Sequence, residues 1–172
     1  MIEKKIETDP VDKLAVVRHY YNGCTSGDLD QLEKTLHPGV VHYFLKPNAG
    51  FAPVFGREHL ARYWRKVARM IDARWIVDHA ITSGTEVVIE WTMFWRPKHG
   101  RERIATRGAE WFVFKDGLIS EIRSYYQQRE HTTELDAFPY DARGYSVKGV
   151  ERSRLHPDAD NYRAIIGEGP SS

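Results

Sequence analysis

The spacing of apolar residues changes once along this chain, and that change constrains the fold more than any other feature. Over residues 10–71, apolar side chains recur every three or four positions, which is the spacing of helices buried on one face. Over residues 74–127 they alternate with polar ones, as in strands that face a core on one side. Helices followed by an antiparallel meander predict an α+β fold.

Capping and breaking residues predict where the elements begin and end. We expect three helices, running from Asp9-Pro10 to Gly27, from Asp28 to Pro38-Gly39, and onward from Gly56, with a short strand over residues 40–45 before the third. Four further strands are predicted over residues 75–82, 86–96, 104–114 and 118–127, with tight turns at Ser83-Gly84 and Asp116-Gly117.

The C-terminal part of the chain has a different character. Residues 131–172 are rich in Gly, Pro and charge without sustained periodicity, yet they contain several aromatic residues. We therefore divide the chain into a domain over residues 1–130 and an arm over residues 131–172 that packs over the domain or over a partner. The segment 138–145 is expected to cover the mouth of a pocket.

Composition excludes several classes of protein. The chain has 25 basic and 24 acidic residues, and this balance gives no sign of a nucleic-acid partner. The single cysteine, Cys24, forms no internal disulfide and suits a reducing compartment. No apolar run approaches the roughly 20 residues of a membrane span, and residues 1–12 do not resemble a signal peptide. We expect a cytoplasmic protein without a membrane partner.

Two short segments resemble a known superfamily. The stretch AVVRHYYNGCTSGDLD (residues 15–30) and the helix start FGREHL (residues 55–60) resemble the nuclear-transport-factor-2-like (NTF2-like) superfamily, in its SnoaL-like and ketosteroid-isomerase-like branches. Limonene epoxide hydrolases and scytalone dehydratases are related to these branches. The resemblance implies a cone in which three N-terminal helices pack in the mouth of a curved antiparallel sheet and enclose one pocket, with the arm as a C-terminal extension.

Strand alternation, read in the register of the superfamily, predicts which side chains face that pocket. If Glu110 points inward, an aromatic cavity with few polar groups results, which suits an apolar small molecule. The expected lining residues are Phe44, Trp64, Trp75, Trp91, Met93, Trp95, Phe112, Ser124 and Tyr126.

The same resemblance supplies candidate catalytic residues. Tyr20 and Glu110 fall on the positions of the ketosteroid-isomerase tyrosine and carboxylic acid, which hold the developing oxyanion. The base position reads Phe44, so His42, two residues earlier on the same strand face, is the nearest substitute. His79 resembles the histidine of scytalone dehydratase and, in the same register, is expected to face the pocket. The histidines do not cluster with carboxylates at metal-ligand spacing, so we expect neither a metal nor another cofactor.

Two functions of different classes follow. The first is a cofactor-independent lyase or isomerase that performs acid–base proton transfer on a hydrophobic cyclic or polyketide-like molecule. The alternative is a non-catalytic small-molecule-binding module, or the small structural subunit of a ring-hydroxylating dioxygenase. In either case we expect a homodimer formed through an apolar patch on the outer face of the sheet, made of Val88, Phe94, Trp111, Val113 and Tyr125.

Overall fold

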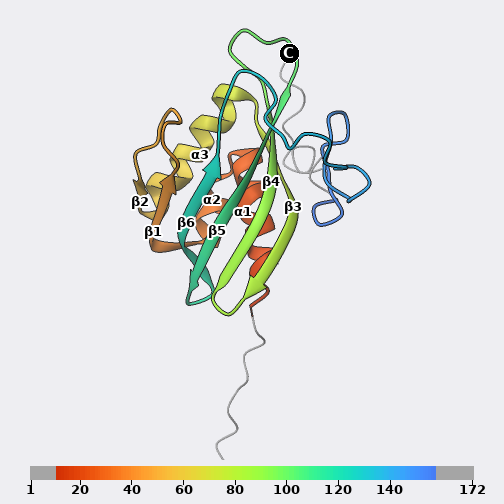
Figure 1. Cartoon of the computed structure of the whole chain (residues 1–172). Coiled ribbons are helices and arrows are strands. Elements are labelled where there is room, and N and C mark those ends of the chain that lie inside the picture. Colours follow the sequence, from red (N-terminus) through yellow and green to blue (C-terminus); the bar gives the residue numbers. More distant parts are fainter. Residues whose placement is uncertain (1–10, 158–172) are drawn as a thin grey trace, which may run out of the picture.

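The computed structural model describes residues 11–157, which form three helices and one six-stranded sheet. The helices lie together on one face of the curved sheet (Figure 1). In chain order the elements are α1 (Lys13–Ser26), α2 (Leu29–Thr35), β1 (Leu36–Phe44), β2 (Val54–Phe55), α3 (Arg57–Ile71), β3 (Arg74–Ser83), β4 (Glu86–Trp95), β5 (Ile104–Lys115) and β6 (Leu118–Tyr126). In the described part of the chain, no helix is long and apolar enough to cross a membrane.

The helix ends follow the capping residues. The predicted start at Asp9-Pro10 lies outside the described residues, and α1 begins only at Lys13, where the Asp12 side chain accepts a hydrogen bond from the Ala15 amide. Gly27 ends this helix in a left-handed conformation, with φ of 70°. The prediction that Asp28 caps α2 is confirmed by its hydrogen bond from the Gln31 amide at 3.1 Å.

The sheet has the strand order β2-β1-β6-β5-β4-β3. Strands β3 to β6 form the predicted antiparallel meander, but β1 pairs with β6 in parallel, so the expectation of a wholly antiparallel sheet is wrong. β1 and β6 lie far apart in the sequence, so no hairpin imposes an antiparallel pairing on them. β1 also begins before Pro38-Gly39 rather than after it, because a register irregularity between Leu36 and Val41 accommodates the proline.

The described part of the arm, residues 131–157, runs from the outer face of the sheet round its β3 edge to helix α1, where the Leu155 carbonyl accepts from Arg18 at 3.0 Å and His156 Nε2 lies 2.6 Å from Asn22 Oδ1. Thr133 pairs with Thr106 of β5, and the Ser146 amide donates to Asp78 of β3 at 2.7 Å. In Figure 1 the blue segment lies beside β3. None of residues 138–145 lines the cavity described below, so the prediction that this segment covers the pocket mouth of its own chain is wrong.

The arm changes the outer face that was expected to form a dimer. Phe94, predicted to be exposed there, is 1% exposed and packs with Ile76 and Ala105. Thr133 donates its amide to the Ala105 carbonyl, which places the arm next to this small cluster. Trp111 and Tyr125 remain exposed, so the arm leaves only part of the predicted patch open.

At Gly108 in β5 there is no room for a side chain. A Cβ atom there would lie 2.5 Å from the indole ring of Trp91, its partner on β4. Because a ring fixed in the core cannot yield as a flexible side chain does, we expect Gly108→Ala to lower the free energy of unfolding by about 1–3 kcal/mol. Urea denaturation followed by tryptophan fluorescence measures this loss.

Gly39 provides the matched control, since a Cβ there would meet only the His37 ring at 3.6 Å. We expect Gly39→Ala to change the stability by less than about 0.5 kcal/mol. Equal stabilities of the two variants would contradict the proposed role of Gly108.

Candidate functional site

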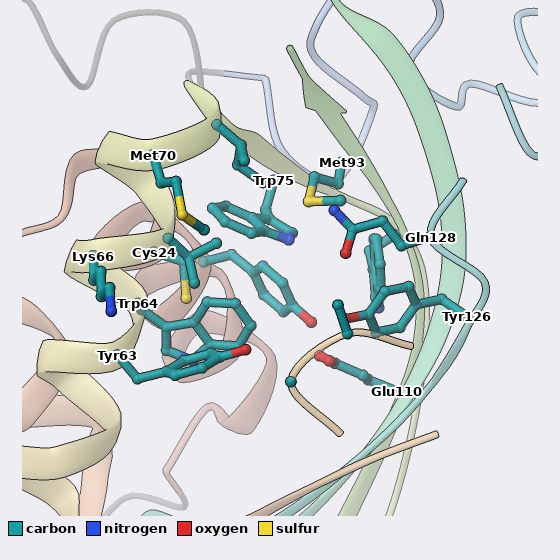
Figure 2. Close-up of a pocket in the computed structure, with 16 residues that line it drawn as sticks. Cys24, Tyr63, Trp64, Lys66, Met70, Trp75, Met93, Glu110, Tyr126 and Gln128 are labelled. Atoms are coloured by element: carbon teal, nitrogen blue, oxygen red, sulfur yellow. The ribbon is translucent and has the colours of Figure 1, made fainter. Parts of the chain in front are cut away.

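A cavity of about 330 Å³ opens between helix α3 and the concave face of the sheet. Figure 2 shows Tyr63, Trp64 and Met70 reaching into it from the helix side and Glu110 and Tyr126 from the sheet side. Its walls are predominantly apolar and aromatic, as in sites that bind small organic molecules. The lining residues are Tyr21, Cys24, Ala49, Gly50, Tyr63, Trp64, Lys66, Val67, Met70, Ile71, Trp75, Trp91, Met93, Glu110, Tyr126 and Gln128.

The structure divides the predicted lining residues into two groups. Members of the first line the cavity: Trp64, Trp75, Trp91, Met93 and Tyr126. Members of the second lie behind its wall: Phe44, Trp95, Phe112 and Ser124. Trp95 donates its indole N–H to Thr106, and Phe112 is fully buried against Tyr20 and Tyr21.

Glu110, Ser124 and His42 form one buried hydrogen-bonded chain. Glu110 and Ser124 are cross-strand partners on β5 and β6, and the Ser124 hydroxyl donates to Glu110 Oε1. His42 Nε2 on β1 lies 2.6 Å from the same hydroxyl and 3.6 Å from Glu110 Oε1. The imidazole stacks on Phe44 at 4.0 Å between ring centroids. Three strands thus bring together a carboxyl, a hydroxyl and an imidazole.

Burial sets the protonation states of Glu110 and His42 in this hydrogen-bonded group. Loss of solvation raises the pKa of Glu110 from 4.5 to about 8, although the hydrogen bond from Ser124 partly opposes this rise. The same cause lowers the pKa of His42 from 6.5 to about 3. At neutral pH Glu110 is therefore mostly a neutral acid and His42 a neutral imidazole. Of the three groups, Glu110 alone lines the cavity.

Tyr20 lies beneath the cavity floor rather than in its lining. It is 1% exposed and makes edge contacts with Tyr21 and Phe112. Burial, with smaller effects from Cys24 and Glu110, raises the pKa of its hydroxyl well above the usual value, which keeps it protonated. The structure thus places Tyr20 near Glu110 but separates it from the open part of the cavity.

His79 does not face the cavity, and the prediction that it does is wrong. A β-bulge interrupts the pairing of β3 with β4: Val77 opposes Trp91, but His79 opposes Glu90. The extra residue in the bulge inverts the alternation, so His79 is exposed on the outer face, where it stacks on Tyr145 of the arm. This position separates it from the other candidate residues.

Several cavity residues were absent from the prediction. Tyr63, Val67, Met70 and Ile71 belong to the apolar stripe of α3, so helical periodicity alone marks them as buried without showing that they line a cavity. Ala49 and Gly50 come from a loop with no such periodicity. Asn48 holds this loop beside β6, because it donates to the Tyr126 carbonyl at 2.7 Å and accepts from the Gln128 amide at 3.0 Å.

The shifted pKa values of Glu110 and His42 predict how the stability of the protein depends on pH above about pH 4.5. Between pH 4.5 and 6.5 Glu110 and His42 have opposite effects on the pH dependence of stability, and these cancel. Folding binds a proton at Glu110 and releases one at His42. Above about pH 6.5 only Glu110 still contributes: the unfolded chain has lost this proton, while the folded one keeps it up to about pH 8. Stability therefore falls as the pH rises, by about 2 kcal/mol between these values.

Urea denaturation at both pH values, with Glu110→Gln as the comparison, checks this prediction. The variant cannot ionise at position 110, so its stability is expected to decline less than that of the wild type over this interval. A decline of the same size in both proteins would contradict the assignment of the raised pKa to Glu110.

Among residues 11–157, no three His, Cys, Asp or Glu side chains are grouped so that they could hold a metal ion. Polar groups at the cavity are one carboxyl group, phenols, indoles, the Gln128 amide and the Lys66 ammonium group, which can donate hydrogen bonds, and the carboxyl group can also transfer a proton. The arrangement is therefore suited to acid–base chemistry on a molecule enclosed by aromatic rings.

A family model described as a SnoaL-like domain matches residues 17–122. A structure from Methylobium petroleophilum PM1, a protein of unknown function with a cystatin-like fold, is 31% identical, with a TM-score of 0.60, and the match covers 80% of this chain and 93% of that one. A comparison with curated proteins found no match.

More distant structures share the fold. A protein from Catenulispora acidiphila with a ketosteroid isomerase-like fold, solved with trimethylamine, is 18% identical over 65% of this chain and 85% of that one, with a TM-score of 0.58. A putative polyketide cyclase from Sinorhizobium meliloti is 18% identical over 64% and 93%, with a TM-score of 0.51. An epoxide hydrolase-like protein from M. tuberculosis is 20% identical over 67% and 82%, with a TM-score of 0.55.

Proposed function

The chain belongs to the SnoaL-like domain family, and from this we propose that it is a cofactor-independent isomerase or lyase. It transfers protons on a hydrophobic cyclic or polyketide-like molecule held in the aromatic cavity. The observation that carries this proposal is a single buried carboxyl, Glu110, which lines the cavity and is hydrogen-bonded through Ser124 to His42. A buried acid of raised pKa in a cavity is typical of a group that exchanges protons near neutral pH.

Between about pH 3 and pH 8 the exchangeable proton of this hydrogen-bonded group is on Glu110, because the pKa of Glu110 is about 8 and that of His42 is about 3. When the proton is on Glu110, the neutral acid donates a hydrogen bond to a substrate carbonyl and stabilises the charge of an enolate. In the ionised fraction of the protein, which grows as the pH approaches 8, Glu110 is a carboxylate that accepts a hydrogen bond from Ser124, and Ser124 in turn accepts one from His42 Nε2–H. This carboxylate takes a proton from the carbon beside that carbonyl. Glu110 then carries that proton. Its return to a different carbon isomerises the substrate, whereas its transfer to a β-hydroxyl lets that group leave as water and so dehydrates the substrate.

In this mechanism His42 is a positioning residue that acts through Ser124. Its side chain is 0% exposed and does not line the cavity, so a direct contact with substrate is not required of it. Tyr20 supports the same site from below, since its neutral hydroxyl lies near the carboxyl group. His79, on the outer face, takes no part.

The direct test is exchange of substrate protons with solvent. In D₂O, the purified protein should catalyse loss of the α-proton signals of a cyclic aryl ketone such as 2-tetralone, as followed by NMR. Ser124→Ala should slow this exchange by about 10- to 100-fold because it removes the hydrogen bond that stabilises the Glu110 carboxylate, whereas Ser124→Thr, which keeps a hydroxyl, should retain most of the rate. Exchange at the uncatalysed rate in the presence of bound ketone would contradict the proposal.

That last outcome would favour the alternative, a binding module or a dioxygenase small subunit. One observation supports this alternative. Of the four candidate catalytic residues, Glu110 lines the cavity and Tyr20, His42 and His79 do not. Binding without exchange identifies a ligand-binding module, and co-purification with a larger chain identifies a subunit.

We also propose that the protein forms a homodimer through the part of the outer face that the arm leaves open. Trp111 and Tyr125 are 37% and 47% exposed there and contact each other edge to face. Light scattering at micromolar concentration should give twice the mass of the chain, and Trp111→Glu should shift it toward the monomer because it places a charge in an apolar interface. A monomeric mass for the wild type would contradict this.

A further inference from the structure

We propose that the substrate is an acid: its anionic group lies at the rim of the cavity beside Lys66, and its enolisable part lies at Glu110. This inference rests on the proposed function and narrows its substrate class to cyclic or aromatic carboxylates and comparably acidic enols. Two independent features of the cavity carry it, the charge of its rim and the hydrogen-bonding character of its interior.

The rim carries one basic side chain, Lys66 of helix α3, which is the only basic residue among the described residues that line the cavity. Arg62, Arg65 and Arg69 lie on the same helix and line a neighbouring hollow together with Lys66, and the helix holds one acidic residue, Glu58. Glu58 lies 3.8 Å from Arg62, at one end of this series. For Lys66 the described part of the chain offers no carboxylate within ion-pair distance. A negatively charged group at the rim would therefore meet a positive potential that is not locally neutralised.

The interior offers hydrogen-bond donors and no negative charge. The Tyr21 hydroxyl, the Trp91 indole N–H and Glu110 Oε2 are buried without a hydrogen-bond partner in the described structure, and all three residues line the cavity. Because Glu110 is neutral near pH 7, each of these groups can donate. Unpaired buried donors are costly, so a ligand rich in oxygen acceptors would be bound in preference to one that brings donors.

The two features lie on opposite sides of the cavity. Figure 2 shows Lys66 on α3 and Glu110 on the sheet, with Trp64 and Tyr63 near the floor between them. A planar ring would therefore occupy the aromatic middle, with an anionic substituent toward α3 and a carbonyl toward β5. A cationic ligand would meet repulsion at the rim and donors in the interior.

Calorimetric titration with three probes of one shape tests this inference: 2-naphthoate, the neutral 2-naphthamide and the cationic 2-naphthylmethylammonium. At about pH 6.5, where Glu110 is neutral, and at low salt, we expect 2-naphthoate to bind most tightly and the cation least. Lys66→Gln should weaken 2-naphthoate binding by about three- to fivefold and leave 2-naphthamide unchanged, and about 0.5 M salt should have a similar selective effect.

Lys115→Gln is the matched control, since Lys115 is exposed at the end of β5, carries the same charge and does not line the cavity. Equal effects of the two substitutions, equal affinity for 2-naphthoate and 2-naphthamide, or no binding of 2-naphthoate would each overturn the inference. If 2-naphthoate shows no preference over 2-naphthamide but the wild type still exchanges the 2-tetralone protons, only the inference fails and the proposed function stands. If the wild type does not catalyse that exchange, the inference and the proposed function both fail.

Discussion

Glu110→Gln should slow the exchange of ketone α-protons by at least about 100-fold, the largest change in activity that we expect from one substitution. The substituted amide would keep the size of the side chain and accept the hydrogen bond from Ser124, but it has no acidic proton to give and no carboxylate to take one. Binding of the ketone should change much less than the rate. NMR exchange rates and calorimetric affinities for wild type and variant measure the two quantities separately.

Tyr126→Phe is the control, because Tyr126 lines the cavity but does not belong to the hydrogen-bonded group of Glu110, Ser124 and His42. Burial, with smaller contributions from Tyr63 and Glu110, raises the pKa of Tyr126, so its phenol stays protonated and cannot serve as a base. We expect this variant to alter binding and to keep most of the exchange rate. A Glu110→Gln variant that exchanges protons as fast as Tyr126→Phe would exclude Glu110 as the acid–base group.

Asp78→Ala is expected to lower the free energy of unfolding by about 3–5 kcal/mol, the largest stability loss that we predict. Asp78 Oδ1 accepts from the amide and the hydroxyl of Ser146, each at 2.7 Å, and Oδ2 accepts from Thr92 and lies 3.8 Å from Arg107. Although burial raises the pKa of this carboxyl, the three hydrogen-bonded contacts and Arg107 oppose the rise. Removing it leaves the donors of Thr92 on β4 and Ser146 on the arm without this acceptor and takes one nearby negative charge from Arg107.

Glu134→Ala is the matched control, because Glu134 is the other carboxylate beside Arg107, at 3.2 Å, and its side chain is 43% exposed. We expect it to cost no more than about 1 kcal/mol. Amide hydrogen exchange should accelerate over residues 133–153 in Asp78→Ala and remain slow in the control. If the two variants have equal stability, Asp78 does not anchor the arm.

Much of the fold was predictable because it depends on local signals. The stop at Gly27 and the cap at Asp28 lie where the sequence predicts them, since capping involves neighbouring backbone groups. The hairpin turn at Asp116-Gly117 is also local: both residues have positive φ, as a two-residue hairpin turn requires. The parallel pairing of β1 with β6 was not predictable in this way, because it joins segments about 80 residues apart along the chain.

The site was predictable only in part, for the same reason. Strand alternation, read in the register of the superfamily with Glu110 taken to point inward, agrees with the cavity lining at Trp91, Met93 and Glu110, since no irregularity interrupts the pairing of β4 with β5. The same rule failed at His79, where one extra residue at Asp78 inverts the alternation. No pattern in the sequence marks a bulge of this kind, because it is stabilised by contacts between Asp78 and the distant arm.

The sequence by itself determined the three helices and the four strands of the meander, which of their faces are apolar, and that a carboxyl lies among aromatic residues. These properties follow from the periods of helix and strand and from the cost of exposing apolar surface. Only the tertiary structure decided that Ser124 links Glu110 to His42 and that Lys66 lies at the rim of the cavity. Those relations depend on distances between separate elements, and packing of the whole core sets these distances.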